Sequence, residues 1–563
     1  MAIQMTEPTT QVPVPLRDQV RAAIARAWDK GAGSGALPAD PDRGSGEIEV
    51  SRPSNAEHGD FATNLALRLA RPLKMPPPAI AHVIVGALNA ERAGNPASPI
   101  ASASVAGPGF VNLRVTDRAL ESLIARVLAD PEGWGRLPAG SGRRVNVEFV
   151  SANPTGPLTV GNARGAFVGD LLARVLEAGG QQVTREYYFN DSGAQVTNLG
   201  ASVLALRNGS PIPEDGYHGD YVADLVARLP ADLAEAGDAG AVGRWATARV
   251  RAGIESSLER LGVHFDVWTT EAKLHSENWV AQAVERLRAG GHIFEQDGAT
   301  WFRSTAFGDD KDRVVYRSDG RPTYFAADIG YLVEKFGRGF DHLIFVWGAD
   351  HHGTVARVRN AAEAMGFDKG AVEMILTGWV RFIRDGEEVS MSKRAGTFIT
   401  LDDLLAELGG DAARWFFASR GANVNMDIDL ELAKKQSSEN PVYYVQYAHA
   451  RIASILRKAD ATGLAPASGV EDALVGPPEA RLARLVARYP EVVEDAAAAQ
   501  EAQGVTTYAT ELATEFHAFY RDARVVDPDA PERSAKRLAL VSATRITLAN
   551  ALGLLGISAP GEM

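Results

Sequence analysis

The sequence predicts a multidomain α/β protein: a doubly wound parallel sheet flanked by an N-terminal α/β domain and a C-terminal α-helical bundle. Two observations predict the sheet. A strand, a glycine-bearing loop, a helix and a second strand occur in order within residues 145–189, and strand, helix and strand recur within residues 342–383. The third observation is that every periodic segment after residue 400 reads as a helix. A chain of 563 residues has room for several domains of roughly 100 to 200 residues.

The composition is that of an ordinary globular protein, and it excludes several kinds of site. Hydrophobic residues make up 45%, charged residues 23%, and the mean hydropathy is -0.12. Without cysteine, the chain cannot form disulfides, thiolate zinc sites, iron–sulfur clusters or thiol nucleophiles. The net charge of -13 repels polyanions, so nucleic-acid contacts must come from local patches. With no signal-peptide core and no apolar run of about 18 residues, we expect a cytoplasmic protein that does not bind membranes.

The N-terminal domain is expected to cover residues 1–118. Residues 16–29 have helical periodicity, and a glycine-rich segment follows at 31–36. That segment resembles a dinucleotide fingerprint, but a helix precedes it where the fingerprint needs a strand, which favours a linker. The rest of the domain is predicted to contain a strand from residue 47, helices at 60–73 and 78–88, and a strand at 110–115.

Residues 119–400 are predicted to form a Rossmann-type domain. Ligands bind at the carboxyl ends of the strands in such a sheet, so the loop after Val150 is the expected site. An insertion of roughly residues 200–300 separates the two halves. Strands are expected at 145–150, 183–189, 342–347 and 373–383, with helices at 163–178 and 354–365.

Residues 401–563 are predicted to be a helical bundle. Thr400 can cap its first helix. Arg481, Arg484 and Arg488 fall on one helical face, which is either a solvated surface or a stripe of phosphate contacts. The helices are expected at 401–407, 411–419, 443–458, 480–499, 506–522 and 531–554.

One loop between a strand and a helix, residues 148–165, carries the strongest chemical signal. It holds two prolines, several glycines and small hydrogen-bonding residues. A helix N-terminus presents free backbone N–H groups and a favourable dipole, so we expect a phosphate or carboxylate there. A tight strand-to-helix turn could use the same residues for structural reasons alone.

Two further segments bear on this site. Residues 389–397 predict a mobile loop whose adjacent cations suit a flap over a polyphosphate, although alone it would more often be a solvated loop. Residues 348–354 follow a strand and include His351 and His352. Adjacent histidines rarely chelate one metal together, so no protein-bound metal is expected. The spacing of this segment mimics a phosphate-binding loop, but the required lysine is absent.

Taken together, the loops resemble the paired signatures of class I aminoacyl-tRNA synthetases, and the wider match is to the arginyl-tRNA synthetase family. Several long motifs in the right order are far more specific than a single pattern. The resemblance runs along nearly the whole chain and is carried by residues 59–64, 107–110, 151–158, 188–195, 319–328, 439–451 and 554–563.

The chain departs from the family pattern at the phosphate site. The first signature usually reads His-x-Gly-His, whereas here it is Thr159-Val160-Gly161-Asn162, so both imidazoles are missing. Thr159 and Asn162 can still donate hydrogen bonds, so we expect slower chemistry rather than none. In the second signature the usual first lysine is Ser390, while Lys393 is retained.

The resemblance implies an arginine–tRNA ligase that couples L-arginine to Mg-ATP, releases pyrophosphate and passes the arginyl group to the terminal ribose of its tRNA. It implies an N-terminal domain at the outer corner of the tRNA and a bundle at the anticodon. Tyr443, Tyr444 and Tyr447 are candidates for stacking on loop bases, or they lie in the core. ATP with Mg²⁺ is expected as a substrate complex, and the protein is expected to be a monomer.

The implied residues fall into four groups. The catalytic residues are Thr159, Asn162 and Lys393. The ATP contacts are Pro157, Gly161, Asn162, Arg164, Ser392 and Lys393. The arginine contacts are Glu148, Ser151, Asn153, Tyr324, Asp328 and Asp350. The signature loop is Ala152, Asn153, Pro154, Thr155, Gly156, Pro157, Leu158, Thr159, Val160, Gly161 and Asn162.

The expected specificity follows from the shape of a guanidinium. It is a planar fork that a carboxylate grips with two hydrogen bonds, and a carboxylate left unpaired rejects other side chains. Tyr324 and Asp328 match the family's guanidinium pocket and lie one helical turn apart. In isolation, Asp328 could instead cap a helix and Tyr324 could lie in a core.

Three alternative functions can be weighed against this one. A catalytically degenerate synthetase-like protein that binds tRNA or nucleotide would explain the missing histidines, but Asn153, Asp328 and Lys393 are retained. Another class I synthetase is disfavoured because cysteine–zinc versions are excluded and residues 440–451 match the arginine branch. A dehydrogenase would need a glycine fingerprint at the first strand-to-helix turn, which has none.

Overall fold

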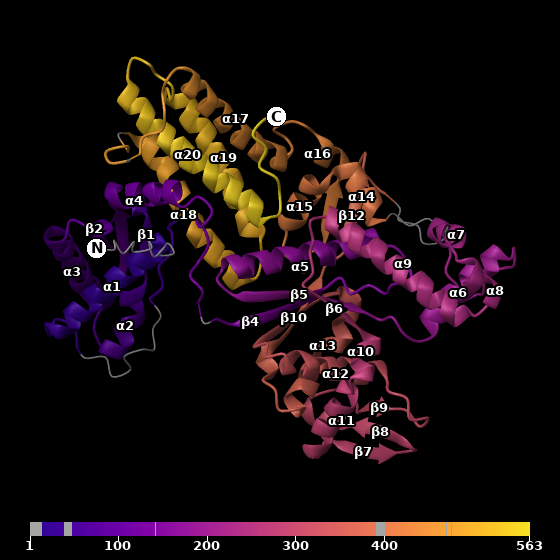
Figure 1. Ribbon diagram of the computed structural model, residues 1–563. Coiled ribbons are helices and arrows are strands. Elements are labelled where there is room, and N and C mark those ends of the chain that lie inside the picture. The colour runs from indigo at the N-terminus through magenta and orange to yellow at the C-terminus, as the bar shows by residue number, and fades with distance from the viewer. Residues whose placement is uncertain (1–13, 39–47, 141, 390–399, 469, 475) are drawn as a thin grey trace, which may run out of the picture.

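The computed structural model describes residues 14–38, 48–140, 142–389, 400–468, 470–474 and 476–563. Three regions follow one another along the chain: an N-terminal α/β domain, a central parallel sheet with its helices, and a C-terminal helical bundle (Figure 1). The predicted fold class is confirmed. None of the helices in these ranges is both long and apolar enough to cross a membrane.

The N-terminal domain contains a small antiparallel sheet in the order β1-β3-β2. The prediction of one helix over 60–73 was wrong at its start, because Phe61 and Thr63 are buried in a strand too short to show alternation. The strand at 100–106 was missed, and the first helix continues through the glycines at 31 and 33. The elements are α1 (Leu16–Gly33), β1 (Phe61–Thr63), α2 (Leu65–Leu73), α3 (Pro77–Gly94), β2 (Ile100–Ala106) and β3 (Phe110–Val115).

The central sheet is parallel throughout and has the strand order β11-β10-β4-β5-β6. The order reverses between β4 and β10, and ligands bind at the carboxyl side of such a switch point. Helix α5 covers one face, while α12 and α13 lie on the other (Figure 1). The elements are β4 (Arg144–Phe149), α5 (Val160–Ala178), β5 (Gln182–Phe189), β6 (Val267–Thr270), α12 (Tyr324–Gly337), β10 (His342–Gly348), α13 (His352–Ala364) and β11 (Val372–Thr377).

Close packing of α5 on β4 fixes the start of the signature loop. Val145, Val147 and Phe149 of β4 are buried. A Cβ on Gly169 of α5 would lie 2.1 Å from the Phe149 ring, so only glycine lets the helix approach this closely. The last residue of β4 is therefore held rigidly under α5.

The predicted insertion at 200–300 is not one block. Between β5 and β6 the chain forms four helices, and it then returns to the central sheet as β6 before leaving again. The return was missed because β6 has only four residues among helices. The inserted elements are α6 (Ala194–Arg207), α7 (Asp220–Ala227), α8 (Ala231–Ala236) and α9 (Ala239–Arg260), then α10 (Glu271–Ser276), α11 (Trp279–Ala289), β7 (Ile293–Gln296), β8 (Ala299–Phe302) and β9 (Arg313–Tyr316).

The strand predicted at 373–383 is two strands, because the chain leaves the sheet at Gly378. A Cβ there would lie 2.7 Å from the Val424 backbone. The second part pairs in another small sheet, and one of its partners lies in the region predicted to be wholly helical, so that prediction was wrong there. These strands are β12 (Val380–Arg384), β13 (Glu387–Glu388) and β14 (Met426–Asp429).

All the predicted helices after residue 400 are present. Thr400 caps the first as expected, since Asp403 N–H donates to its Oγ1 at 3.0 Å. Helix α4 (Asp117–Ala129), which begins at the expected end of the N-terminal domain, packs on the bundle helices α18 and α20. The helices are α14 (Leu401–Leu408), α15 (Gly410–Ala418), α16 (Leu430–Lys434), α17 (Pro441–Ala461), α18 (Pro477–Ala499), α19 (Gln503–Asp522) and α20 (Pro531–Leu554).

Ion pairs join the N-terminal domain to α18. Arg52 donates two hydrogen bonds to the buried Glu491, at 2.7 and 2.8 Å. Arg484 of α18 donates to Asp60 at 2.6 Å. Arg17 of α1 contacts two further carboxylates of α18, those of Glu494 and Asp495.

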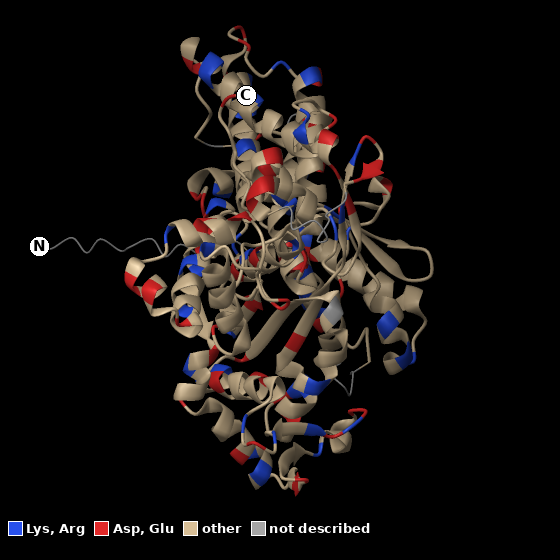
Figure 2. Ribbon diagram, turned by 90° about the vertical axis from the view of Figure 1, so that its right-hand side faces the viewer, with Lys and Arg blue, Asp and Glu red and all other residues tan. Residues whose placement is uncertain are grey.

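The arginine face of α18 is thus engaged within the protein. Besides the pair formed by Arg484, Arg481 donates to Glu515 and Arg488 to Glu511 of α19, both at 2.9 Å. These arginines lie in ion pairs at the protein surface, and Arg481 is still 48% exposed. A role in phosphate contact stays a prediction. Elsewhere, basic and acidic residues are interspersed along the ribbon (Figure 2).

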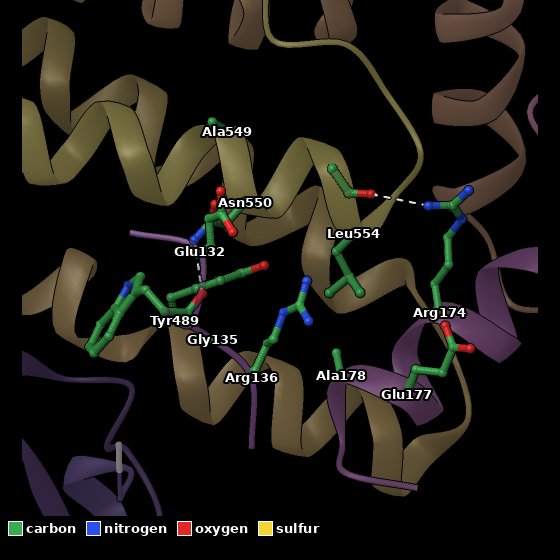
Figure 3. Close-up of a pocket in the computed structure, with 12 residues that line it drawn as sticks. Glu132, Gly135, Arg136, Arg174, Glu177, Ala178, Tyr489, Ala549, Asn550 and Leu554 are labelled. Atoms are coloured by element: carbon green, nitrogen blue, oxygen red, sulfur yellow. Dashed lines mark hydrogen bonds between the residues drawn. The ribbon is translucent and has the colours of Figure 1, made fainter. Parts of the chain in front are cut away.

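A cavity of about 470 Å³ lies where the segment before β4 meets α5 and α20 (Figure 3). Asn550 of α20 donates to the carbonyls of Pro131 and Trp134, at 2.7 and 2.9 Å. Arg174 of α5 donates to the Gly553 carbonyl. The Asn550 bonds tie the linker between the N-terminal domain and the sheet to the bundle, and the Arg174 bond ties α5 to the same helix.

Candidate active site

The chain leaves β4 through a strained turn. Val150 and Ser151 have φ values of 67° and 42°. A β-branched residue in this region costs of the order of 1 to 3 kcal/mol, and such strain is concentrated at functional sites. The turn is held by hydrogen bonds: Ser151 Oγ donates to Glu148 Oε1 at 3.1 Å, and Tyr188 N–H donates to Ser151 Oγ at 3.2 Å. Ser151 thereby fixes the direction of Glu148.

The signature loop is anchored from two sides. Ala152 N–H donates to the Tyr187 hydroxyl at 3.0 Å, and that hydroxyl donates to the Ala152 carbonyl at 3.1 Å. Burial raises the pKa of Tyr187, so the hydroxyl keeps its proton. On the other side, Tyr221 of α7 donates to the Thr155 carbonyl at 2.9 Å. The loop is therefore positioned by both β5 and the inserted helices.

The two substituted signature positions cap α5. Asn162 Oδ1 accepts from the Thr159 N–H at 2.9 Å and from the Thr159 hydroxyl at 3.0 Å. This capping begins the helix at Val160, three residues before the predicted start. The amide NH₂ of Asn162 has no hydrogen-bond acceptor among the residues that the structure describes, so it is available for a ligand.

Arg164 does not fit the predicted ATP contact. Its guanidinium is buried and donates to the carbonyls of Gly421, Ala422 and Val424, at 2.8, 3.1 and 2.8 Å. These bonds fix the loop before β14 to α5. The sequence suggested a ligand contact because the residue lies in the first turn of α5, but its side chain points to the protein interior.

Three carboxylates and a tyrosine gather at the carboxyl ends of β4, β5 and β6. Burial, together with the nearby Glu148 and Glu271, raises the pKa of Asp328 to about 7. Burial likewise raises the pKa of Tyr188, which is hydrogen-bonded to Glu271 and close to Asp328. Within the described ranges, no lysine or arginine pairs with Asp328. The cluster thus presents negative charge that a bound cation would stabilise.

A buried lysine, Lys335, forms an ion pair with Glu148, one of these carboxylates. Lys335 of α12 has an exposed fraction of 0%, and its Nζ lies 2.9 Å from Glu148 Oε2 and 3.6 Å from Glu186 Oε2. Burial raises the pKa of Glu148, and the ammonium of Lys335 opposes that shift. Burial also disfavours ionised Glu186, but Lys335 and Arg338 together lower its pKa to about 2. Lys335 therefore anchors Glu148 beneath the site.

Comparison with known proteins shows the family. The model of the arginyl tRNA synthetase N terminal domain matches residues 15–115, and that of the class I (R) tRNA synthetase catalytic domain matches 124–209 and 235–454. The DALR anticodon binding domain model matches 445–563. The chain belongs to the arginyl-tRNA synthetase family. The resemblance inferred from the sequence motifs is confirmed.

Individual relatives match along almost the whole chain. The arginine–tRNA ligase of Frankia alni is 45% identical over 98% of this chain and 100% of its own length. That of Bacillus licheniformis is 45% identical over 92% of this chain and 94% of its own. Thermus thermophilus arginyl-tRNA synthetase, at 24% identity, shares the fold with a TM-score of 0.74 over 97% of this chain and all of its own.

Glu271 is a carboxylate of this cluster that the sequence analysis missed in this arginyl-tRNA synthetase. It directly follows β6, so it lies at the carboxyl edge of the central sheet beside the ends of β4 and β5. The available signal was its position after the short apolar segment 267–270. Because that segment was assigned to an insertion, no edge residue was expected there.

Other predicted site residues are less closely engaged or lie outside the described residues. Asn153 is exposed in the signature loop, and Tyr324 begins α12 with 72% of its surface exposed. Asp350 lies in a short turn directly after β10, and its side chain is outside the described part. Ser392 and Lys393 lie outside the described residues altogether. The roles of these residues stay predictions.

Proposed function

We propose that this arginine–tRNA ligase activates L-arginine at the carboxyl edge of the central sheet, with the guanidinium beside Glu148, Glu271 and Asp328. The observation that carries the proposal is the gathering of carboxylates at this edge, where Asp328 lies beside Glu148 and Glu271 and pairs with no lysine or arginine in the described ranges. A bound guanidinium would pair with these groups and lower the free energy of their ionised forms. A neutral or acidic side chain would leave the cluster unpaired, which explains selection of arginine.

In the first step, the carboxylate of arginine attacks the α-phosphorus of ATP. The bond to the β,γ-diphosphate breaks, and pyrophosphate leaves with its electron pair. Charge on the phosphoryl oxygens is stabilised by N–H groups at the start of α5 and by the amide of Asn162, each worth about 3 to 4 kcal/mol by analogy with oxyanion holes. Lys393 is proposed to supply a cation to the separating phosphates. ATP enters with Mg²⁺, which neutralises phosphate charge.

In the second step, the terminal ribose hydroxyl of tRNA attacks the arginyl carbonyl and AMP leaves. For the rest of the tRNA, aromatic side chains on α17 favour a stacking surface. The rings of Tyr443 and Tyr447 are nearly parallel, with centroids 6.5 Å apart, and Tyr447 is 40% exposed. Tyr444 is instead packed against His517, with its hydroxyl donating to Thr514.

We also propose that the enzyme acts as a monomer in the cytoplasm. The absence of cysteine suits a reducing compartment, where disulfides are rare.

The direct test of this function is charging of bulk bacterial tRNA with Mg-ATP and each amino acid in turn. We expect arginine alone to be attached, with one AMP and one pyrophosphate formed for each arginine. Retention of tRNA on the protein without attachment of any amino acid would favour the binding-only alternative. Attachment of a different amino acid would contradict the proposed pocket.

The role of Asn162 can be separated from its capping role by two variants. Asn162→Asp keeps the oxygen that caps Thr159 and places a charge that the helix dipole favours, but it removes the amide donor. We expect kcat/KM for arginine activation to fall by about 10² to 10³ with little change in thermal stability. Asn162→Ala should lose a similar amount of activity and about 1 kcal/mol of stability. Full activity in the Asn162→Asp variant would show that the residue is only a cap.

A further inference from the structure

We propose that a second pocket, beside the signature loop, binds phosphates of the tRNA strand whose 3′ end receives the arginyl group. This proposal rests on the proposed function. The pocket has a volume of about 260 Å³ and lies between α7, α9 and the signature loop. Its lining includes Pro157, Tyr221, Arg228, Arg249, Gly253 and Arg260. We call it the arginine-lined pocket.

Its basic groups follow one face of α9. Arg249, Gly253, Ser256 and Arg260 are spaced four, three and four residues apart, so all lie on the same side of the helix. Arg249 and Arg260 are eleven residues apart along the helix, which at 1.5 Å per residue is about 16 Å. In a duplex, the phosphates of one strand recur about every 3.4 Å along the helix axis, and they are farther apart along the strand itself. The stripe is therefore long enough to contact more than one phosphate.

Two of the guanidinium groups are free to bind an anion. Arg228 and Arg249 are exposed, and neither forms an ion pair with any residue in the described ranges. Arg249 lies 4.6 Å from the centroid of the Trp245 ring, which orients its guanidinium without neutralising it. In a chain of net charge -13, two such groups in one cavity make a local basic patch.

The third guanidinium is fixed in place. Arg260 pairs with Asp402 at 2.5 Å, and it donates to Ser256 and Ser257 at 3.3 and 3.2 Å. Asp402 also accepts from Ser257 at 2.9 Å. Because Asp402 follows the start of α14, this network joins the pocket wall to the segment that leads out of the second signature.

At Gly253, in the middle of this face of α9, no side chain covers the helix backbone. Gly253 is exposed in the interior of α9, where glycine is destabilising relative to alanine. A Cβ at this position would meet no atom within 4 Å, so packing does not explain the glycine. A glycine instead allows a ligand backbone to approach the helix closely.

The remaining polar groups favour RNA over a simple polyanion. The carboxylates of Asp224 and Asp402 line the same pocket as the arginines. They would repel free phosphate, whereas an RNA strand offers 2′-hydroxyl donors between its phosphates. The mixed lining therefore fits a ribonucleotide strand.

The pocket adjoins the site of chemistry. Tyr221, which lines it, donates to the Thr155 carbonyl of the signature loop at 2.9 Å. Leu401 N–H donates to the Leu158 carbonyl at 2.9 Å, on the side of Asp402. A strand held here would end near the arginine site. The catalytic-domain model does not match residues 210–234, so Tyr221 and Arg228 belong to a segment that this model does not specify.

The test compares two double variants of the full-length protein. Arg228→Gln with Arg249→Gln removes both free charges from the pocket. Arg207→Gln with Arg244→Gln removes two exposed charges from the same insertion outside the pocket and serves as the matched control. We expect the pocket variant to raise the Kd for tRNA at least tenfold at 0.1 M salt. The slope of log Kd against log salt should fall by about 1.4, the value for two phosphates of a single strand.

Two further arms identify the source of the phosphates. Removing the single-stranded 3′ end of the tRNA should abolish most of the difference between the pocket variant and the wild type. The Kd for ATP, measured without tRNA, should be equal in all three proteins. Unchanged tRNA binding in the pocket variant would overturn the proposal, and so would a loss confined to ATP, which would assign the pocket to the triphosphate. Wild-type protein that binds tRNA but attaches no arginine would contradict the proposed function instead.

Discussion

Asp328→Asn is expected to reduce kcat/KM for arginine by about 10³ and, at the same time, to stabilise the folded protein above pH 7. The activity falls because a guanidinium would lose a charged partner, which costs about 4 kcal/mol. Asparagine has the same shape, so the cavity itself should persist. The measurement is steady-state aminoacylation with arginine, and variant activity within tenfold of the wild type would contradict the assignment of Asp328.

The gain in stability follows from the pKa of the same residue. Because the folded state raises this pKa from its usual 3.8 to about 7, folded Asp328 binds a proton that the unfolded chain has released. The free energy of unfolding of the wild type should therefore fall as pH rises from 4 to 7, by up to about 4 kcal/mol. Urea unfolding should show a larger stabilisation by asparagine at pH 8 than at pH 5. An equal effect at both pH values would exclude the raised pKa.

Arginine binding should be coupled to release of the proton from the Asp328 carboxyl. Below pH 7 the Asp328 carboxyl is protonated, so its ionisation must accompany guanidinium binding. We expect the Kd for arginine to rise about tenfold per pH unit below 7, and proton release to appear in calorimetry with buffers of different ionisation enthalpy. The Asp328→Asn variant is the control, because its weaker binding should vary much less with pH.

Lys335→Met is expected to destabilise the protein by about 3 to 5 kcal/mol. The substitution leaves Glu148, 2.9 Å from the lost ammonium, without its buried cation. Glu186 keeps Arg338 at 2.6 Å, so the main loss arises at Glu148. Urea unfolding at neutral pH measures the effect.

A double variant separates the stability effect from the role of Glu148 in binding. Adding Glu148→Gln to Lys335→Met removes the unpaired charge, so much of the stability should return while the affinity for arginine stays low. Recovery of arginine affinity together with stability would show that Glu148 does not bind the substrate. Destabilisation of less than 1 kcal/mol in the single variant would contradict the buried ion pair.

The regular parts of this fold were predictable because their periodicity is long. Strand β4, helix α5 and the long bundle helices each show one pattern over most of their length, whereas β1 and β6 are too short to show any. Misreading β6 had a consequence beyond its four residues, because it hid the position of Glu271. Neither periodicity nor length identifies so short a strand in the sequence. Its position in a sheet is decided by pairing with segments that are distant in the chain.

From the residues alone, without the family resemblance that joined Glu148 to Asp328, the site was predictable only where its residues follow one another in the chain. The signature loop and the helix N-terminus are contiguous, and the structure keeps them together. The partners of Glu148 and Arg164 are not, since Lys335 lies on another helix and the carbonyls of Gly421 and Val424 lie far along the chain. Which charged residue faces the ligand and which faces the interior is decided by these long-range contacts.

The ion pairs between the N-terminal domain and α18 fix the distance between that domain and the far end of the bundle. Arg52, Arg484 and Arg17 fix the first domain to the bundle, while α4 and Asn550 fasten the linker that could otherwise act as a hinge. The two ends that would touch the outer corner and the anticodon of one RNA are therefore set at a fixed separation. We therefore expect an RNA whose bend differs from that of the matching tRNA to contact the N-terminal domain or the bundle, but not both at once.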